Sequence, residues 1–499
     1  MKFYKFWQRH NAKASFSREP LSFDLSFQLS YMASVAAAGV PRAKIFELAG
    51  ELPSSCSKYF KTVNIMCQKL GYDYPEACRM VGQSAKEWEI KSLLLRIADA
   101  LNAGESETEF YAREAELHVE VYGNDYARNL ESLSKWTDAY ESLIVSVTLI
   151  VLVAVVSMMI YSVSTTFLFG LLVTMVLVSC GGVYLIYTVV PKEVKTHSAS
   201  MGSPSQLLSR RLFKFLLPVS VVGSAGLLAT GADSGWILVM AGAMLFPVGM
   251  VAVYGEREMD RQDQEIATFL RALGNVASGA GATVTDAVSR LDLRATASLS
   301  GQIHRLRSRL KTQIDPDICW QRFVTETGSE LVSRSVGMFH DAVHMGAEPE
   351  DAGGRSSMLA LKVSLMRAKR KLISGTFMWL SFAMHAVSVG LFVFIVNIVD
   401  QFGTMIHGAQ EELLEAENSS SLPLGNMFSF SFGNAQVLWM IIIPVILVLT
   451  VTNALAPYLT EGGDKYKIPF YLGITSVISG VLIMAVPRIA SGFFVSASG

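Results

Sequence analysis

Residues 275–282 read NVASGAGA, and they belong to a long polar stretch, 256–371, that lies between two apolar runs. A similar segment, SVAAAGV, occupies residues 34–40. In these two segments Gly39 and Gly281 lie 242 residues apart. Because both segments combine small residues with a glycine, each is typical of a turn between two helices.

Two further pairs of segments lie in the same register. DALNAG at 99–104 matches DAVHMG at 341–346 at the offset of 242, and DYPEAC at 73–78 matches DPDIC at 315–319 at nearly that offset. Three matches in register predict a duplicated domain. The residues that mark its structural turns are Gly39, Asp99, Gly104, Gly281, Asp341 and Gly346.

The composition indicates a membrane protein. Of the 499 residues, 51% are hydrophobic and only 17% are charged, which is too apolar for an ordinary soluble chain. The net charge of −1 gives no reason to expect a nucleic-acid partner. Helical spacing of apolar residues recurs outside the membrane spans, and no alternating strand pattern competes with it. The predicted fold class is therefore all-α, polytopic, with about seven transmembrane helices and two duplicated helical-bundle domains in the cytoplasm.

The apolar runs define the expected domains. Residues 143–163, for example, form 21 positions without a charge, which is enough to cross a hydrocarbon core about 30 Å thick. In chain order we expect a basic leader at 1–21 without a cleaved signal peptide, helical domain 1 at 22–142, four transmembrane helices as two hairpins at 143–254, helical domain 2 at 255–371, transmembrane helix 5 at 372–399, an acidic outer loop at 400–436, transmembrane helices 6 and 7 at 437–488, and an outer tail at 489–499.

The distribution of Lys and Arg predicts the orientation. These residues are frequent before the first span and in 191–214, 255–371 and 460–467, and they are absent from 164–166, 232–235 and 400–435. By the positive-inside rule, the N-terminus lies in the cytoplasm of a cell-membrane protein and the C-terminus lies outside. In the third span, Pro218, Gly223 and Gly226 predict kinks or close helix packing.

The search for catalytic motifs is negative. No G-x-x-x-x-G-K-[S/T] phosphate loop occurs, so the chain should not hydrolyse nucleotide itself. The pair His340 and His344 has the spacing that zinc proteases use, but Asp341 stands where those enzymes carry glutamate. The matching segment 98–102 has neither histidine. A structural role is therefore favoured over a metalloprotease, and we expect no catalytic residue, no cofactor and no metal site.

The remaining polar residues favour packing over transport chemistry. Cys56, Cys67 and Cys78 form no Cys-x-x-Cys motif, and buried thiols are favoured over a metal site or a disulfide. No carboxylate lies within the spans, which argues against an ion-driven carrier. His385 and Asn397 in the fifth span are the main polar residues there, and an interhelical hydrogen bond is favoured over a proton relay for His385.

Two basic clusters are candidates for partner binding. One would lie along a helix of the second domain and the other at the membrane boundary; their residues are Arg305, Arg307, Arg309, Lys311, and Lys369, Arg370, Lys371. The first could be a solvated helix face, and the second could anchor the topology and contact lipid phosphates. Alternatively, both dock an acidic surface of a soluble protein.

This organisation resembles the type II secretion system F family, the platform proteins of type IV pilus-like machines. The resemblance rests on segment 25–48 with its Ala-Ala-Ala-Gly turn, on 97–104, and on their repeats at 267–291 and 339–346. The paired hairpins after the first domain are most similar to the archaeal branch, with its FlaJ-type and TadC-like proteins.

The resemblance implies a non-enzymatic platform that binds a hexameric secretion ATPase in the cytoplasm and helps to assemble pilin-like subunits into a surface filament. The archaellum, an adhesive pilus and a DNA-uptake pilus all remain open, the family also allows a homodimer, and the acidic loop leaves room for a pilin contact. The alternative is a permease or export-channel subunit in which the helical domains are regulatory.

Overall fold

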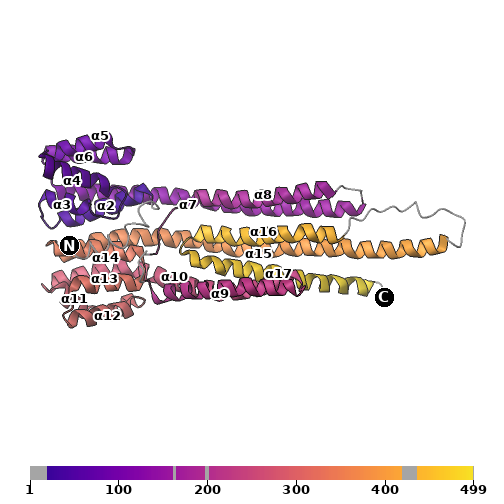
Figure 1. Ribbon diagram of the computed structural model, residues 1–499. Helices are drawn as coiled ribbons and strands as arrows, with labels where there is room; N and C mark the ends of the chain where they lie inside the picture. The colour runs from indigo at the N-terminus through magenta and orange to yellow at the C-terminus, as the bar shows by residue number, and fades with distance from the viewer. Residues whose placement is uncertain (1–19, 161–164, 197–201, 418–434, 498–499) are drawn as a thin grey trace. The chain divides into compact units, whose positions relative to one another are not determined.

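The chain is helical almost throughout its described part. The computed structural model describes residues 20–160, 165–196, 202–417 and 435–497 (Figure 1). Within these ranges the β-pairing is limited to an isolated bridge between Thr196 and Ser329. The predicted all-α class is confirmed. Nearly all of the expected basic leader lies outside the described residues.

Two sets of six helices form the repeats. Repeat 1 consists of α2 (Leu21–Ala36), α3 (Arg42–Ala49), α4 (Ser57–Leu70), α5 (Tyr74–Ser84), α6 (Trp88–Ala103) and the first part of α7 (Glu107–Ile160). Repeat 2 consists of the last part of α10 (Ser234–Gly279), α11 (Val284–Arg290), α12 (Ser300–Lys311), α13 (Pro316–Thr327), α14 (Glu330–His344) and the first part of α15 (Pro349–Glu417), with a short 3₁₀ turn, η1 (Leu293–Thr296), before α12.

The helices of the two repeats begin in nearly one register. The offset is 242 residues for the pairs of first helical residues Arg42/Val284, Tyr74/Pro316, Trp88/Glu330 and Glu107/Pro349. Only α4 and α12 differ, by a single residue, since they begin at Ser57 and Ser300. The offset that three short sequence matches predicted therefore holds for the first residues of four of the five helices that begin within both repeats, whereas the helix ends depart from it by one residue.

Left-handed residues close the same three turns in both repeats. In repeat 1 they are Gly39, Gly71 and Gly104, with φ of 66°, 75° and 73°, and in repeat 2 they are Gly281, Gln313 and Gly346, with φ of 53°, 58° and 103°. Such residues end helices because their backbone amides bond carbonyls of the last turn. Gln313 takes the place of Gly71 and is, among the described residues, the non-glycine residue with positive φ.

Both repeats belong to one compact unit, in which α2 packs against α14. Arg334 of α14 is buried, with its guanidinium 4.9 Å from the rings of Phe23 and Phe27 and 3.7 Å from a carboxylate oxygen of Asp24. Tyr31 of α2 donates a hydrogen bond of 2.9 Å to Asp341 of α14. Polar contacts between α2 and α14 therefore fix the two repeats to each other.

Seven of the described helices are long and apolar enough to span a membrane, in agreement with the sequence. They are α7, α8 (Thr165–Val189), α9 (Pro204–Ala229), α10, α15, α16 (Ala435–Glu461) and α17 (Ile468–Ala497). Most of their apolar length belongs to a second compact unit, formed by residues 130–190, 209–253 and 370–499.

Two domain limits differ from the sequence expectation. Helix α15 continues to Glu417, so that residues 400–417 of the expected acidic loop are helical, and residues 418–434 lie outside the described part. Helix α17 likewise continues to Ala497, through most of the expected tail. Residues 400–417 contain many good helix formers (Gln, Glu, Leu and Ala) and no proline, which explains why the helix continues.

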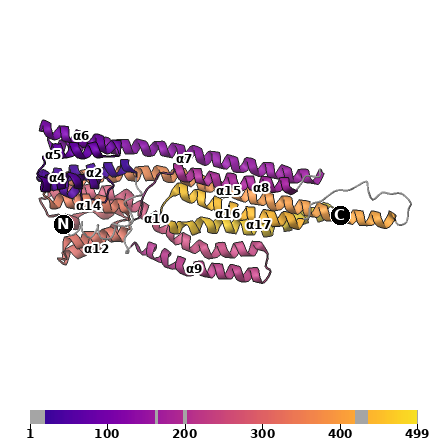
Figure 2. The ribbon, with the colours of Figure 1, turned by 45° about the horizontal axis from the view of Figure 1, so that its top comes forward.

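Close glycine packing occurs on α10 and α17. Gly235, Gly242 and Gly249 recur every seven residues on α10, and a Cβ atom on Gly242 would lie 2.7 Å from the carbonyl oxygen of Gly473 on α17. The expectation for the third span was wrong at Gly226, where a Cβ atom would meet nothing within 4 Å. Helix α9, which carries Gly226, lies at the edge of the membrane unit next to α10 (Figure 2).

Candidate partner-binding site

The predicted basic residues 305–311 lie on α12 but do not share one face. Ile303, Leu306 and Leu310 are buried in the core of repeat 2 and set the orientation of this helix. Arg305 and Arg309 lie one turn apart and both pair with Glu326 of α13; the Arg305 Nε to Glu326 Oε2 distance is 2.8 Å. These two arginines therefore stabilise the contact between α12 and α13.

Arg307 and Lys311 lie on another side of α12. Arg307 is half-buried, and its Nε has no hydrogen-bond partner within the described part of the chain. Lys311 is exposed. Positions two residues apart on a helix point about 200° away from each other, so alternating arginines in the sequence cannot form a single stripe. The basic charge available to a partner on α12 is that of Arg307 and Lys311.

The membrane-proximal cluster is also divided. Lys369 is exposed and Lys371 is half-buried. Arg370 is only 3% exposed, and its guanidinium donates to the carbonyl oxygens of Thr460 (2.9 Å) and Leu459 (3.2 Å) near the C-terminal end of α16. A buried guanidinium that caps helix carbonyls cannot present its charge to a soluble partner. Arg370 is thus a structural residue, in contrast to the docking role expected from the sequence.

A buried network of charges that the sequence reading missed lies around the segment 191–196. Arg367 is 8% exposed and pairs with Glu193 and with Asp263, the latter at 2.5 Å. Lys195 and Glu256 form a second buried pair at 3.0 Å. Each buried charge would be costly alone and is tolerated because it is paired. We name this network, Glu193, Lys195, Glu256, Asp263 and Arg367, the strap cluster.

The strap cluster ties the segment between α8 and α9 to repeat 2. The carbonyl of Lys195 accepts a hydrogen bond of 3.0 Å from the amide of Glu330, the first residue of α14. Ser329, which caps α14, also donates to Asp263. The sequence signal was present in Pro-Lys-Glu-Val-Lys at 191–195, but the partners lie up to 174 residues away, and no local pattern identifies them.

His340 and His344 stack on each other with ring centroids 6.1 Å apart. The Nε2 atom of His340 lies 3.3 Å from a carboxylate oxygen of Asp317. No group of three or more residues that could hold a metal ion occurs in the described part of the chain. Asp341 accepts the hydrogen bond from Tyr31, whereas its counterpart Asp99 lies 3.2 Å from Arg79, so the two aspartates do not share a contact.

His385 in the membrane unit makes the interhelical hydrogen bonds expected of it. Its Nε2 lies 2.9 Å from Ser479 Oγ, and its Nδ1 lies 3.1 Å from Asn453 Nδ2. Asn453 Oδ1 accepts a hydrogen bond of 2.7 Å from the hydroxyl of Tyr140. Since the Asn453 amide nitrogen then donates to Nδ1, the proton of His385 is placed on Nε2. Asn397, in contrast, donates to Val393 of its own helix.

The three cysteines of repeat 1 are free thiols that contribute to packing. Cys56 and Cys78 are fully buried, and burial raises the pKa of both thiols to about 12. Cys67 is half-buried, and burial raises the pKa of its thiol also. The thiolate is the reactive form, so Cys56 and Cys78 are chemically inert in the folded protein.

Two curated proteins show what the chain is similar to. It is 25% identical over 345 residues to Flagella accessory protein J of Methanocaldococcus jannaschii, and 23% identical over 322 residues to Flagella accessory protein J of Methanococcus voltae. The chain is similar in sequence to flagella accessory protein J. The resemblance to FlaJ-type proteins that the sequence predicted is thus confirmed.

Each alignment covers only part of the two sequences that it compares. They cover 65% and 61% of this chain and 59% and 56% of the two relatives, so the chain spans a little under three fifths of the length of the curated proteins that it matches. No family model matches the chain, and no solved structure matches it.

Proposed function

We propose that this protein is the non-enzymatic membrane platform of a type IV pilus-like filament machine, of the archaellum kind that the name of its relatives suggests. On this proposal both repeats lie in the cytoplasm, with the N-terminus inside and the C-terminus outside. A secretion ATPase binds the repeats, and its movement is transmitted to pilin-like subunits in the membrane.

The observation that carries this proposal is the continuity of α7 and α15. Helix α7 has 54 residues and α15 has 69, and each begins in a polar repeat and contains an apolar, membrane-spanning length. At 1.5 Å per residue, α7 is roughly 80 Å long. An unbroken helix is well suited to carry movement from a repeat to a span, because it contains no flexible joint.

An insertion tests this continuity. Four residues, Gly-Ser-Gly-Ser, placed after Asn129 in α7 should abolish filament assembly in cells, while membrane insertion and co-purification of the ATPase persist. The same insertion after Gly231, in the turn between α9 and α10, is the matched control and should leave assembly intact. Normal filaments from the α7 insertion variant, counted by electron microscopy, would contradict the proposal.

The docking surface is tested separately on α12. The double reversal Arg307→Glu/Lys311→Glu should reduce co-purification of the ATPase without changing the thermal stability of the protein. The double reversal Arg305→Glu/Arg309→Glu should lower the stability as well, because it removes both pairs with Glu326. If only the second variant loses the ATPase, α12 acts through its packing and is not the docking surface.

A further inference from the structure

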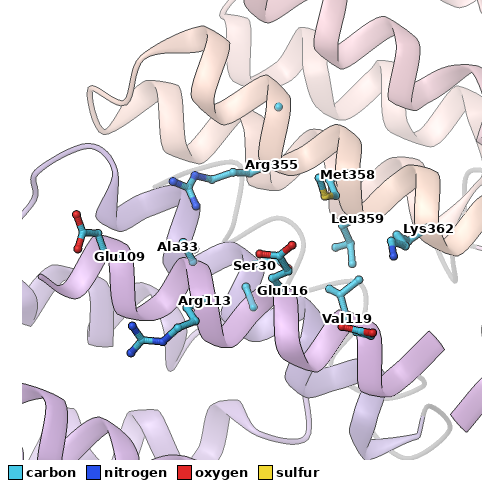
Figure 3. A pocket seen from close by; sticks show the side chains of 14 residues that line it. Ser30, Ala33, Glu109, Arg113, Glu116, Val119, Arg355, Met358, Leu359 and Lys362 are labelled. Atoms are coloured by element: carbon cyan, nitrogen blue, oxygen red, sulfur yellow. The ribbon is translucent and has the colours of Figure 1, made fainter. Parts of the chain in front are cut away.

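A groove in the unit of the two repeats lies between α7, α15 and α2. It encloses a cavity of about 510 Å³. Figure 3 shows α15 with Arg355, Met358 and Lys362 on one side of the gap and α7 with Glu109 and Glu116 on the other. Because α7 and α15 are equivalent helices of the two repeats, the groove lies between two copies of the same element.

The two walls carry opposite charge. Glu109, Glu116 and Glu120 line the α7 wall, and Arg355 and Lys362 line the α15 wall. Glu120 and Lys362 are equivalent positions at the offset of 242 residues, so the duplicated helices differ in the sign of their charge at this place. We call these sets the acidic wall and the basic wall.

The charged side chains of both walls lack partners in the part of the chain that the structure describes. None of the five residues makes a hydrogen bond or an ion pair with any residue in the described part of the chain. Arg113, which also lines the groove, differs because it pairs with Glu105 at 2.7 Å. Opposite charges thus line the two walls of a gap without pairing, which leaves both available to something placed between them.

The residues of each wall lie on one face of their helix, at the spacing by which helices contact a neighbouring helix. On α7 the residues Glu109, Arg113, Glu116 and Glu120 follow each other at intervals of four, three and four, and on α15 Arg355, Met358 and Lys362 follow at three and four. Charged residues at such intervals flank the seams of coiled coils, where they pair with a neighbouring helix. From Glu109 to Glu120 the wall is roughly 16 Å long, the length of three helical turns.

Apolar residues also line the groove between the two charged walls, and we call this set the floor. It is formed by small and aliphatic side chains, Ala33, Ala112, Ala115, Val119 and Leu359. Alanine and the adjacent Gly354 allow a neighbouring backbone to approach closely, and valine and leucine provide apolar contact. An apolar floor between charged walls is the arrangement by which grooves bind amphipathic helices.

We propose that this groove binds an amphipathic helix of a partner protein. The helix presents about three turns of small or aliphatic residues to the floor, basic residues to the acidic wall and acidic residues to the basic wall. The groove is separate from Arg307 and Lys311 on α12, so this inference does not depend on ATPase docking.

The test measures binding of designed peptides to the full-length protein in nanodiscs of zwitterionic lipid. The bipolar probe is a labelled helical peptide of about fourteen residues with an Ala/Leu stripe, lysines along one flank and glutamates along the other. Two control peptides carry lysine on both flanks or glutamate on both flanks. Fluorescence anisotropy should show the bipolar peptide binding about tenfold more tightly than either control.

A charge swap in the protein provides the discriminating experiment. In Glu116→Lys/Glu120→Lys the α7 wall keeps Glu109 as its acidic residue and becomes mainly basic, like the α15 wall. The bipolar peptide should then lose about tenfold in affinity, and the all-glutamate peptide should become the tightest ligand. Loss of folding cannot produce such an exchange of preference. Glu76→Lys, on the exposed surface of α5, is the matched control and should change neither affinity.

Three outcomes would overturn the proposal. The first is equal binding of all three peptides, and the second is a charge swap that leaves their order unchanged. The third is binding of the bipolar peptide only after removal of residues 1–19, which would assign the groove to a segment of the chain itself.

Discussion

Substitution of Arg367 by methionine should destabilise the unit of the two repeats strongly. Arg367 is 8% exposed and is the cation that pairs with Glu193 and Asp263, which are 6% and 2% exposed. Methionine keeps much of the side-chain length but leaves two buried carboxylates without this cation. Breaking a buried pair by removal of one partner typically costs about 3–5 kcal/mol.

The expected loss converts into a large shift of the melting temperature. For a unit of this size, about 1 kcal/mol corresponds to roughly 2–4 °C, so Arg367→Met should lower Tm by about 10 °C. The assay is thermal unfolding of the full-length protein in detergent, followed by circular dichroism. Lys369→Met is the matched control, because Lys369 is two residues away and exposed, and it should shift Tm by about 1 °C or less.

A triple substitution separates pairing from packing. In Glu193→Gln/Asp263→Asn/Arg367→Met all three charges are removed, and neutral groups of similar size remain. Replacement of a complete buried ion pair by neutral groups is often tolerated, so most of the lost stability should return. If the triple variant is as unstable as Arg367→Met, or if Arg367→Met equals Lys369→Met, the reasoning about the strap cluster is wrong.

Three further predictions concern packing. Asn453→Leu should cost about 1–2 kcal/mol in unfolding by sodium dodecyl sulfate, because it leaves Tyr140 and His385 without this partner inside the membrane unit, whereas Asn397→Leu should cost less; equal effects would contradict the interhelical role. Gly242→Leu should lower the thermal stability by about 1–3 kcal/mol, since its side chain would meet the backbone of Gly473, and Gly226→Leu should be nearly neutral. Cys56 and Cys78 should resist labelling by maleimide at neutral pH until the protein is unfolded, because burial raises the pKa of each thiol, and rapid labelling of either, measured by mass spectrometry, would refute their burial.

The sequence predicted the repeat and the spans well for physical reasons. The repeat is visible because turns with positive φ strongly favour glycine, so Gly39 and Gly281, and Gly104 and Gly346, are preserved as markers of the turns. The spans are visible because about 20 apolar residues in a row have few other uses. Both signals are local, and local signals can be read without knowing which residues meet in space.

The roles of the charged residues could not be read in the same way. The sequence does not show whether a basic residue is buried or exposed. The neighbours Lys369 and Arg370 both carry positive charge, but Arg370 is buried and its guanidinium donates to carbonyl oxygens near the end of α16, whereas Lys369 is exposed. Arg305 and Arg309 form ion pairs with Glu326. Arg367 forms ion pairs with Glu193 and Asp263, which lie 174 and 104 residues away in the sequence. Long-range pairing decides which charges a partner can reach, and only the structure gives that information.

The groove illustrates the same limit. The sequence alone assigned no binding role to Glu109, Glu116 and Glu120, because acidic residues on a helix are most often a solvated face. Arg355 and Lys362, which line the other wall of the groove, lie more than 230 residues later in the sequence. The internal repeat gives one signal, since it aligns Glu120 with Lys362 and so shows that the equivalent helices carry opposite charge at this position.

The constant offset between the repeats has a consequence for how this protein can change over evolutionary time. Surface turns between helices usually gain and lose residues freely, because lengthening a loop costs little free energy. Here the one-residue difference at α4 and α12 is cancelled before α5 and α13, and every later helix returns to the original frame. Each connection between helices nevertheless differs in length between the two repeats by one or two residues, and the neighbouring helices differ in length so that the offset is restored. Gain or loss of a residue in one of these turns should therefore be tolerated where the adjoining helix can lengthen or shorten to compensate.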